Sequence, residues 1–269
     1  MNAFLRRMRA LLRRFATELR LEILRARLWN VAPGSEVEID GITLRVTDGP
    51  NAYMQYKDEV VRRVYAFTTT NPVPVVIDGG ANVGMFTIAT RRDHPTAQIR
   101  AFEPDPAVFA MLEHNLSRNG VAGVQVVNAA LGASAGEASF APDGEAGGAL
   151  NVSGAVRVRV ETLSSQLATP VDFLKLNIEG AELDVLREAA NAGRLQNVRA
   201  MVLEYHGWPD GEQRLGAILS LLDTQGYRYT VHDLDEQTNP ATKPPFRPPG
   251  AAPWFVLVHA WRTVPEPTR

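Results

Sequence analysis

The chain has 269 residues, of which 45% are hydrophobic and 22% are charged, and this composition excludes a mainly disordered protein. Its length accommodates one large domain with additional elements, and it is too short for two ordinary domains with separate cores. The formal net charge of -2 gives no electrostatic reason to expect a nucleic-acid partner. The chain contains no cysteine, which excludes disulfides and fits a reducing compartment, so we expect a cytoplasmic protein.

Residues 1–30 contain eight arginines and two glutamates, which gives this segment a charge of about +6. Arginines interrupt its apolar residues, so neither a signal peptide nor a membrane span is predicted. Apolar residues recur at helical spacing, with most of the arginines on the other side: Phe4, Met8, Leu11, Leu12, Phe15, Leu19 and Ile23. We expect a basic amphipathic helix packed on the domain or on a second subunit of a homo-oligomer. The alternative is peripheral contact of residues 1–25 with anionic lipid at the inner face of the membrane.

Two further elements complete an N-terminal extension, which we assign to residues 1–70, ahead of a main domain at 71–269. Residues 36–47 alternate between apolar and polar side chains around Asp40-Gly41, and this pattern predicts a β-hairpin. Apolar residues at mixed helical spacing then predict a helix over 54–67, and the prolines at 72 and 74 end this part of the chain.

The rest of the chain alternates between predicted strands and predicted helices. The strands are expected near residues 74–78, 98–103, 124–128, 171–177, 199–205, 226–232 and 254–260. The helices are expected near residues 83–92, 106–119, 181–192 and 211–225. This order predicts a doubly wound α/β fold with a mostly parallel, seven-stranded sheet. An extra hairpin with a glycine-rich loop at 143–148 is expected within 136–161, and a proline-rich loop at 239–250.

A glycine-rich turn follows the first strand of this predicted sheet. Residues 75–86 read as a buried strand, then a turn containing Gly80 and Gly84, then the start of a helix. Glycines let the backbone approach a ligand closely, and the helix N-terminus favours an anionic group. Glu103 ends the next strand, nineteen residues after Gly84, where an acid can accept hydrogen bonds from both hydroxyls of a ribose. The pattern predicts a nucleotide-like ligand, and the spacing G-A-N-x-G differs from the dinucleotide fingerprint G-x-G-x-x-G.

Five motifs in order resemble the FkbM-type methyltransferase family, and the similarity covers about residues 70–210. They are residues 77–84 (IDGGANVG), 101–105 (AFEPD), 115–119 (NLSRN), 128–132 (NAALG) and 175–182 (KLNIEGAE). The resemblance implies a class I, Rossmann-like methyltransferase fold, S-adenosylmethionine as methyl donor, and usually methylation of oxygen. The residues expected to bind the donor are Asp78, Gly80, Ala81, Asn82, Gly84, Glu103, Pro104, Asn128 and Ala129.

Two positions depart from the common family pattern. Asn177 stands where aspartate is frequent in the K-x-D-x-E-G motif, and Ser164 stands where aspartate often follows T-L. We therefore predict no metal site.

Polar residues at the ends of two further strands are the candidates for catalysis. Lys175, Asn177 and Glu179 alternate along one strand, so Asn177 and Glu179 can face the cleft at its carboxyl edge. Two alternatives are that Glu179 caps the following helix and that Lys175 is a buried structural cation with a carboxylate partner. Glu204 and His206 end the next strand, and the neutral imidazole of His206 is the natural base for a hydroxyl acceptor.

We therefore predict an O-methyltransferase for a hydroxyl on a small molecule, natural product or glycan. One alternative is a non-catalytic protein that binds S-adenosylmethionine or acts as a membrane-associated scaffold through its basic helix. Another is a nicotinamide-dependent oxidoreductase, because a strand, a glycine turn and an acid also suit NAD. The G-A-N-x-G spacing and the later motifs argue against the oxidoreductase.

Overall fold

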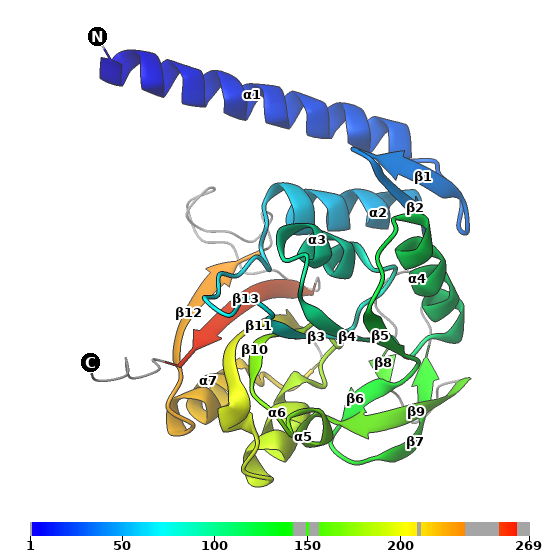
Figure 1. Cartoon of the computed structure of the whole chain (residues 1–269), viewed down its shortest axis with the longest axis vertical. Helices are drawn as coiled ribbons and strands as arrows, with labels where there is room; N and C mark the ends of the chain where they lie inside the picture. The colour runs from blue at the N-terminus through cyan, green and yellow to red at the C-terminus, as the bar shows by residue number, and fades with distance from the viewer. Residues whose placement is uncertain (1, 142–148, 151–155, 209–210, 235–252, 263–269) are drawn as a thin grey trace.

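The computed structural model describes residues 2–141, 149–150, 156–208, 211–234 and 253–262 (Figure 1). The two loops expected at 143–148 and 239–250 lie outside the described residues.

A seven-stranded sheet forms the centre of the protein, in the order β12-β13-β11-β10-β3-β4-β5. The strands are β3 (Val75–Gly79), β4 (Gln98–Phe102), β5 (Val124–Val127), β10 (Val171–Leu176), β11 (Val198–Gly207), β12 (Arg228–Asp233) and β13 (Trp254–Trp261). Neighbouring strands from β5 to β11 run parallel, whereas β13 runs antiparallel to both β11 and β12. The predicted mostly parallel, doubly wound α/β fold is confirmed.

Helices cover both faces of this sheet, as the strand alternation requires. They are α3 (Met85–Asp93), α4 (Pro106–Arg118), α5 (Leu163–Gln166), α6 (Glu182–Asn191), the short 3-10 helix η2 (Leu195–Asn197) and α7 (Leu215–Thr224). On β10, Leu174 and Leu176 pack with residues of α6 and α7, while Phe173 packs on the opposite face with Phe86 of α3. Because successive strand residues face opposite ways, Lys175 lies on the same face as Phe173.

A second, four-stranded sheet is inserted between β5 and β10. It contains β6 (Ala130–Gly132), β7 (Gly136–Ala141), β8 (Ala149–Leu150) and β9 (Val156–Thr162), in the order β6-β9-β7-β8. Strands β7 and β9 pair antiparallel, so the expected extra hairpin is present.

The N-terminal extension contains α1 (Asn2–Leu28), β1 (Glu36–Ile39), β2 (Ile42–Arg45), α2 (Gly49–Gln55) and the π-helix η1 (Tyr56–Val61). The predicted hairpin is present as β1 and β2. The helix predicted over 54–67 begins earlier, because Asp48 caps it by accepting a hydrogen bond from the Asn51 amide at 2.7 Å, and it ends at Val61. Its second half is π-helical. This form is rare in proteins, and where it occurs it is often found at functional sites.

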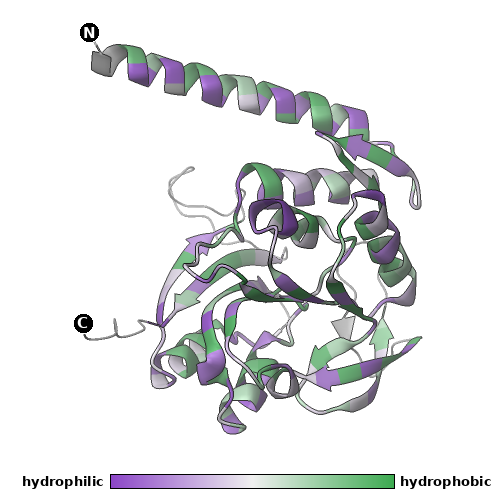
Figure 2. Cartoon of the chain, viewed as in Figure 1, coloured by the Kyte–Doolittle hydropathy of each residue, from purple (hydrophilic) through white to green (hydrophobic). Residues whose placement is uncertain are grey.

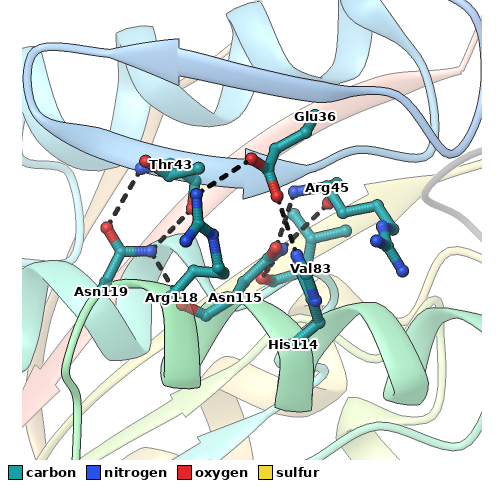
Figure 3. A network of polar contacts seen from close by, with 8 residues as sticks. All are labelled: Glu36, Thr43, Arg45, Val83, His114, Asn115, Arg118 and Asn119. Carbon is teal, nitrogen blue, oxygen red and sulfur yellow. Dashed lines mark hydrogen bonds and ion pairs between the residues drawn. The ribbon is translucent and has the colours of Figure 1, made fainter.

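Asn115 of α4 and Asn119, which caps the carboxyl end of α4, attach the hairpin to this helix (Figure 3). The fully buried Asn115 accepts from the Arg45 amide at 2.6 Å and donates to the Arg45 carbonyl at 2.9 Å and the Val83 carbonyl at 2.8 Å. Asn119 binds both backbone groups of Thr43 in the same way, at 3.1 and 2.7 Å. These side chains form hydrogen bonds with the backbone groups on the outer edge of β2, as a neighbouring strand would.

Helix α1 packs on the domain near its carboxyl end, and the expected packing on a second subunit stays a prediction. It runs across one end of the molecule (Figure 1), and among its side chains whose burial is described only Leu21, Leu24 and Leu28, near its carboxyl end, are buried. Leu11 and Phe15 are 69% and 68% exposed, and apolar and polar residues alternate along the projecting part (Figure 2). No helix in the described part of the chain combines the length and the hydropathy needed to span a bilayer.

Candidate active site

The turn after β3 has a backbone that only glycine accommodates at position 80. Gly80 has a φ of +76°, and a Cβ there would lie 1.8 Å from the carbonyl oxygen of Asn177 at the end of β10. Gly84 precedes α3 with a φ of +94°, and a Cβ there would meet the side chain of Leu112 at 2.7 Å. The turn therefore lies directly against the end of a neighbouring strand.

Glu103 joins this turn to the end of β4. Its carboxylate accepts hydrogen bonds from the backbone amides of Asn82 and Asp105, both at 2.9 Å. The side chain is 6% exposed, and burial raises the pKa of Glu103 to about 7 although both amides act to lower it. A carboxylate has about four acceptor positions, so two remain for hydroxyl groups of a ligand.

Asn128 and Asp78, which we predicted to bind the donor, instead support the residues that line the site. The Asn128 side chain donates to the carbonyls of Glu103 and Pro104, at 2.8 and 3.1 Å, and thereby holds the loop after β4. Asp78 is fully buried, and Thr87 donates to it at 2.7 Å.

A buried ion pair links β3 to β10. The Lys175 ammonium lies 3.1 Å from Asp78 and also donates to the carbonyl of Gly80. Burial acts to lower the pKa of Lys175, but the nearby carboxylates of Asp78 and Glu59 outweigh it and raise the pKa above its usual value. Lys175 therefore stays protonated, and the alternative that it is a buried structural cation with a carboxylate partner matches this geometry.

His206 lies between two carboxylates at the end of β11. Its Nε2 is 3.4 Å from Glu179 and 3.8 Å from Glu204. The ring is 7% exposed, stacks on Trp208 and meets Phe255 edge-on. Burial lowers the pKa of His206, so the imidazole is neutral near pH 7.

Glu182, and not Glu179, organises the start of α6. The Glu182 carboxylate accepts from the amides of Ile178 and Gly180, at 3.0 and 3.3 Å, while Ala181 occupies the N-cap without a side-chain bond. Glu179 has a φ of +54° within the turn that these bonds shape. Glu182 thus makes these bonds ahead of α6, and the Glu179 carboxylate lies 3.4 Å from Nε2 of His206.

The N-terminal extension adds two site residues that the sequence did not indicate. Tyr65 donates to the carboxylate of Glu204, and its ring lies 5.6 Å from the Lys175 ammonium. Glu59 of η1 has a fully enclosed Oε2 with no hydrogen-bond partner among the described residues. Burial raises the pKa of Glu59 to about 8. The signal that points to these residues is the π-helical form of η1, and it is visible in the structure but not in the sequence.

An open cleft of about 2050 Å³ runs along the carboxyl edge of the sheet. The sequence-predicted residues that line it are Gly80, Ala81, Asn82, Glu103, Pro104, Ala129, Lys175, Asn177, Glu179, Glu204 and His206. Asp78, Gly84 and Asn128 lie behind this surface and do not line it. Ligand pockets are commonly about 300–1,000 Å³, so the cleft has room for a donor and an acceptor together.

The geometry fits a nucleoside that carries an amino-acid side chain. The acceptor positions of Glu103 that the protein leaves free suit ribose hydroxyls. The backbone amides of residues 80–84 bond within the protein, and the close approach at Gly80 is to the Asn177 carbonyl, so the turn does not offer the unpaired amides that the sequence led us to expect. The described residues contain no group of three or more histidine, aspartate or glutamate side chains arranged to hold a metal ion. The fold and this site define a class I methyltransferase that uses S-adenosylmethionine.

The chain belongs to the FkbM methyltransferase family, because the model of the methyltransferase FkbM domain matches residues 78–229. It is 28% identical over 235 residues to methyltransferase sdnD of Sordaria araneosa, covering 72% of this chain and 89% of that protein. It is also 28% identical over 233 residues to the 31-O-demethyl-FK506 methyltransferase FkbM of Streptomyces tacrolimicus, covering 71% and 87%.

A solved structure shares the fold at low sequence identity. The Pyrococcus horikoshii protein PH0793 superposes with a TM-score of 0.50 at 13% identity, covering 86% of this chain and 72% of that one.

Proposed function

We propose that this methyltransferase transfers the methyl group to a hydroxyl oxygen of a small molecule, natural product or glycan, with His206 as the base. The observation that carries the proposal is the position of a buried, neutral imidazole between Glu179 and Glu204 in the cleft. S-adenosylmethionine, when bound, supplies an electrophilic methyl group. An alcohol is a poor nucleophile, so a residue that accepts its proton accelerates the reaction.

The residues around His206 suit this role. Once His206 takes a proton at Nε2, the carboxylates of Glu179 and Glu204 stabilise the imidazolium. Tyr65 fixes Glu204 by donating to it, and the rings of Trp208 and Phe255 fix the imidazole and exclude water. Lys175 is protonated and buried, so it organises the turn at Gly80 and does not accept the proton.

Features of the same cleft support the proposed acceptor class. Polar groups that can bind hydroxyls, including Asn177 and Glu59, lie with His206 in a cleft open enough for a ring-sized molecule. The relative from Streptomyces tacrolimicus is named for an O-demethylated substrate, which supports oxygen as the acceptor atom.

The test is methyl transfer to a panel of hydroxylated natural products and sugars, each paired with an analogue in which an amine replaces the hydroxyl. Mass spectrometry detects methylation, and NMR of the product locates the new methyl carbon on oxygen or nitrogen. The proposal predicts methylation of at least one hydroxyl acceptor and no turnover of its amine partner. Methylation of amines in preference to hydroxyls would contradict oxygen transfer, and donor binding without turnover of any acceptor would favour a non-catalytic protein.

A further inference from the structure

Helix α1 presents two apolar faces on opposite sides. At about 3.6 residues per turn, Leu21, Leu24 and Leu28 share one side, and this side is buried against the hairpin and α2. The second face consists of Met8, Leu11, Leu12, Phe15, Leu19 and Ile23, each 42% exposed or more. These residues recur three and four positions apart and form one continuous stripe.

This exposed stripe points away from the rest of the described protein. Leu24 is 8% exposed, whereas Ile23, one residue earlier and on the other side, is 62% exposed. Because α1 is attached by the opposite side, bending it toward the domain would not cover the stripe. A contiguous apolar surface of this kind marks an interaction site.

The charge of α1 favours one kind of partner for the stripe. Arginines flank the stripe on both edges, with Arg9 and Arg20 on one side and Arg7 and Arg25 on the other. Within the described residues Arg20 pairs with Asp40 and Arg25 with Glu22, while Arg7 and Arg9 are exposed and make no ion pair. An apolar stripe bordered by cations suits an anionic lipid surface, where the arginines reach lipid phosphates.

We propose that α1 lies in the interface of an anionic membrane with this stripe inserted among the acyl chains. A second copy of the chain fits less well, because pairing two stripes would bring together two segments of about +6 each. The α1 residues that line the cleft, among them Glu18, Leu21 and Arg25, lie off the stripe. A membrane-bound α1 therefore leaves the cleft open, and the catalytic domain lies next to the lipid surface.

The experiment is co-sedimentation of the full chain with vesicles of phosphatidylcholine alone or mixed equally with phosphatidylglycerol. We expect at least about tenfold stronger binding to the anionic vesicles, which weakens as salt is raised. The variant Phe15→Ser/Leu19→Ser should lose about tenfold or more of this binding. The matched control Val231→Ser removes another exposed apolar side chain, 42% exposed on β12, and should bind vesicles like the wild type.

Two further readouts separate the competing explanations. Affinity for S-adenosylhomocysteine should be the same in all three proteins, which shows that each is folded. Light scattering without lipid reports the mass in solution. Equal binding to both vesicle types, or unchanged binding by Phe15→Ser/Leu19→Ser, would overturn the proposal. A dimer that binds no vesicles and dissociates in Phe15→Ser/Leu19→Ser would assign the stripe to a second copy and overturn it as well.

Discussion

The backbone amide of Asn82 donates to the Glu103 carboxylate at 2.9 Å, so the turn after β3 and the end of β4 form one unit. Glu103→Ala removes both this bond and the acceptor for ribose hydroxyls. We expect S-adenosylhomocysteine binding to weaken by roughly 1–3 kcal/mol with the fold retained. Calorimetry on the wild type and variant measures this, with circular dichroism as the check on folding; an unchanged affinity would remove Glu103 from the donor site.

The same carboxyl group makes donor binding depend on pH. Burial raises the pKa of Glu103 to about 7, so the ionised acceptor form dominates above pH 7 and the neutral form below it. Affinity for S-adenosylhomocysteine should therefore be highest above pH 7 and decline as pH falls, approaching about tenfold per pH unit. In Glu103→Gln the contribution of this group is absent, and a variant with the same pH profile as the wild type would be inconsistent with this assignment.

Gly80→Ala should destabilise the protein, because its φ is +76° and the new Cβ would lie 1.8 Å from the Asn177 carbonyl oxygen. We expect a decrease of more than about 2 kcal/mol in the free energy of unfolding. Gly216→Ala is the matched control, since Gly216 lies in α7 with open space around it, and it should be neutral or stabilising by about 0.5–1 kcal/mol. Urea denaturation of both variants compares them, and equal stabilities would show that the turn tolerates a side chain.

Much of the fold was predictable because its signals are local. Short stretches of sequence were enough to predict the glycine turn and the alternation of strands and helices. The same holds for the strand ends at Glu103 and His206. The π-helical form of residues 56–61 was not predictable, because Glu59 is buried beside Lys175, Asp78 and Glu204, which come from distant parts of the chain.

The candidate site was predictable only in part. Tyr65 and Glu204 are 139 residues apart, and their hydrogen bond depends on how the N-terminal extension folds over the sheet. The hydrophobic pattern of α1 was visible, but the burial of Leu21 and Leu24 instead of the larger stripe depends on tertiary packing.

Removing the buried ammonium should leave Asp78 as an uncompensated charge. Lys175→Met is expected to lower the free energy of unfolding by about 3–5 kcal/mol, since the pair lies 3.1 Å apart and both side chains are almost fully buried. The double variant Asp78→Asn/Lys175→Met should recover part of that loss. A double variant no more stable than Lys175→Met alone would show that the ion pair does not account for the effect.

For catalysis, His206→Ala should lower kcat about 10²–10⁴-fold while S-adenosylhomocysteine affinity stays nearly constant. Because burial lowers the pKa of His206, its imidazole remains neutral until the pH falls below its usual value of 6.5. At saturating donor, kcat of the wild type should hold through neutral pH and decline below pH 6.5. A decrease in kcat of under about threefold in His206→Ala would mean that orientation of the acceptor dominates catalysis and that His206 only lines the site.

The most direct test of the central claim is calorimetric titration of the full chain with S-adenosylhomocysteine and, separately, with NAD and NADP. The glycine turn with the spacing G-A-N-x-G and the Glu103 carboxylate predict micromolar affinity for S-adenosylhomocysteine and no measurable binding of either nicotinamide dinucleotide. Tight binding of NAD together with no binding of S-adenosylhomocysteine would contradict the assignment of this cleft to methyl transfer.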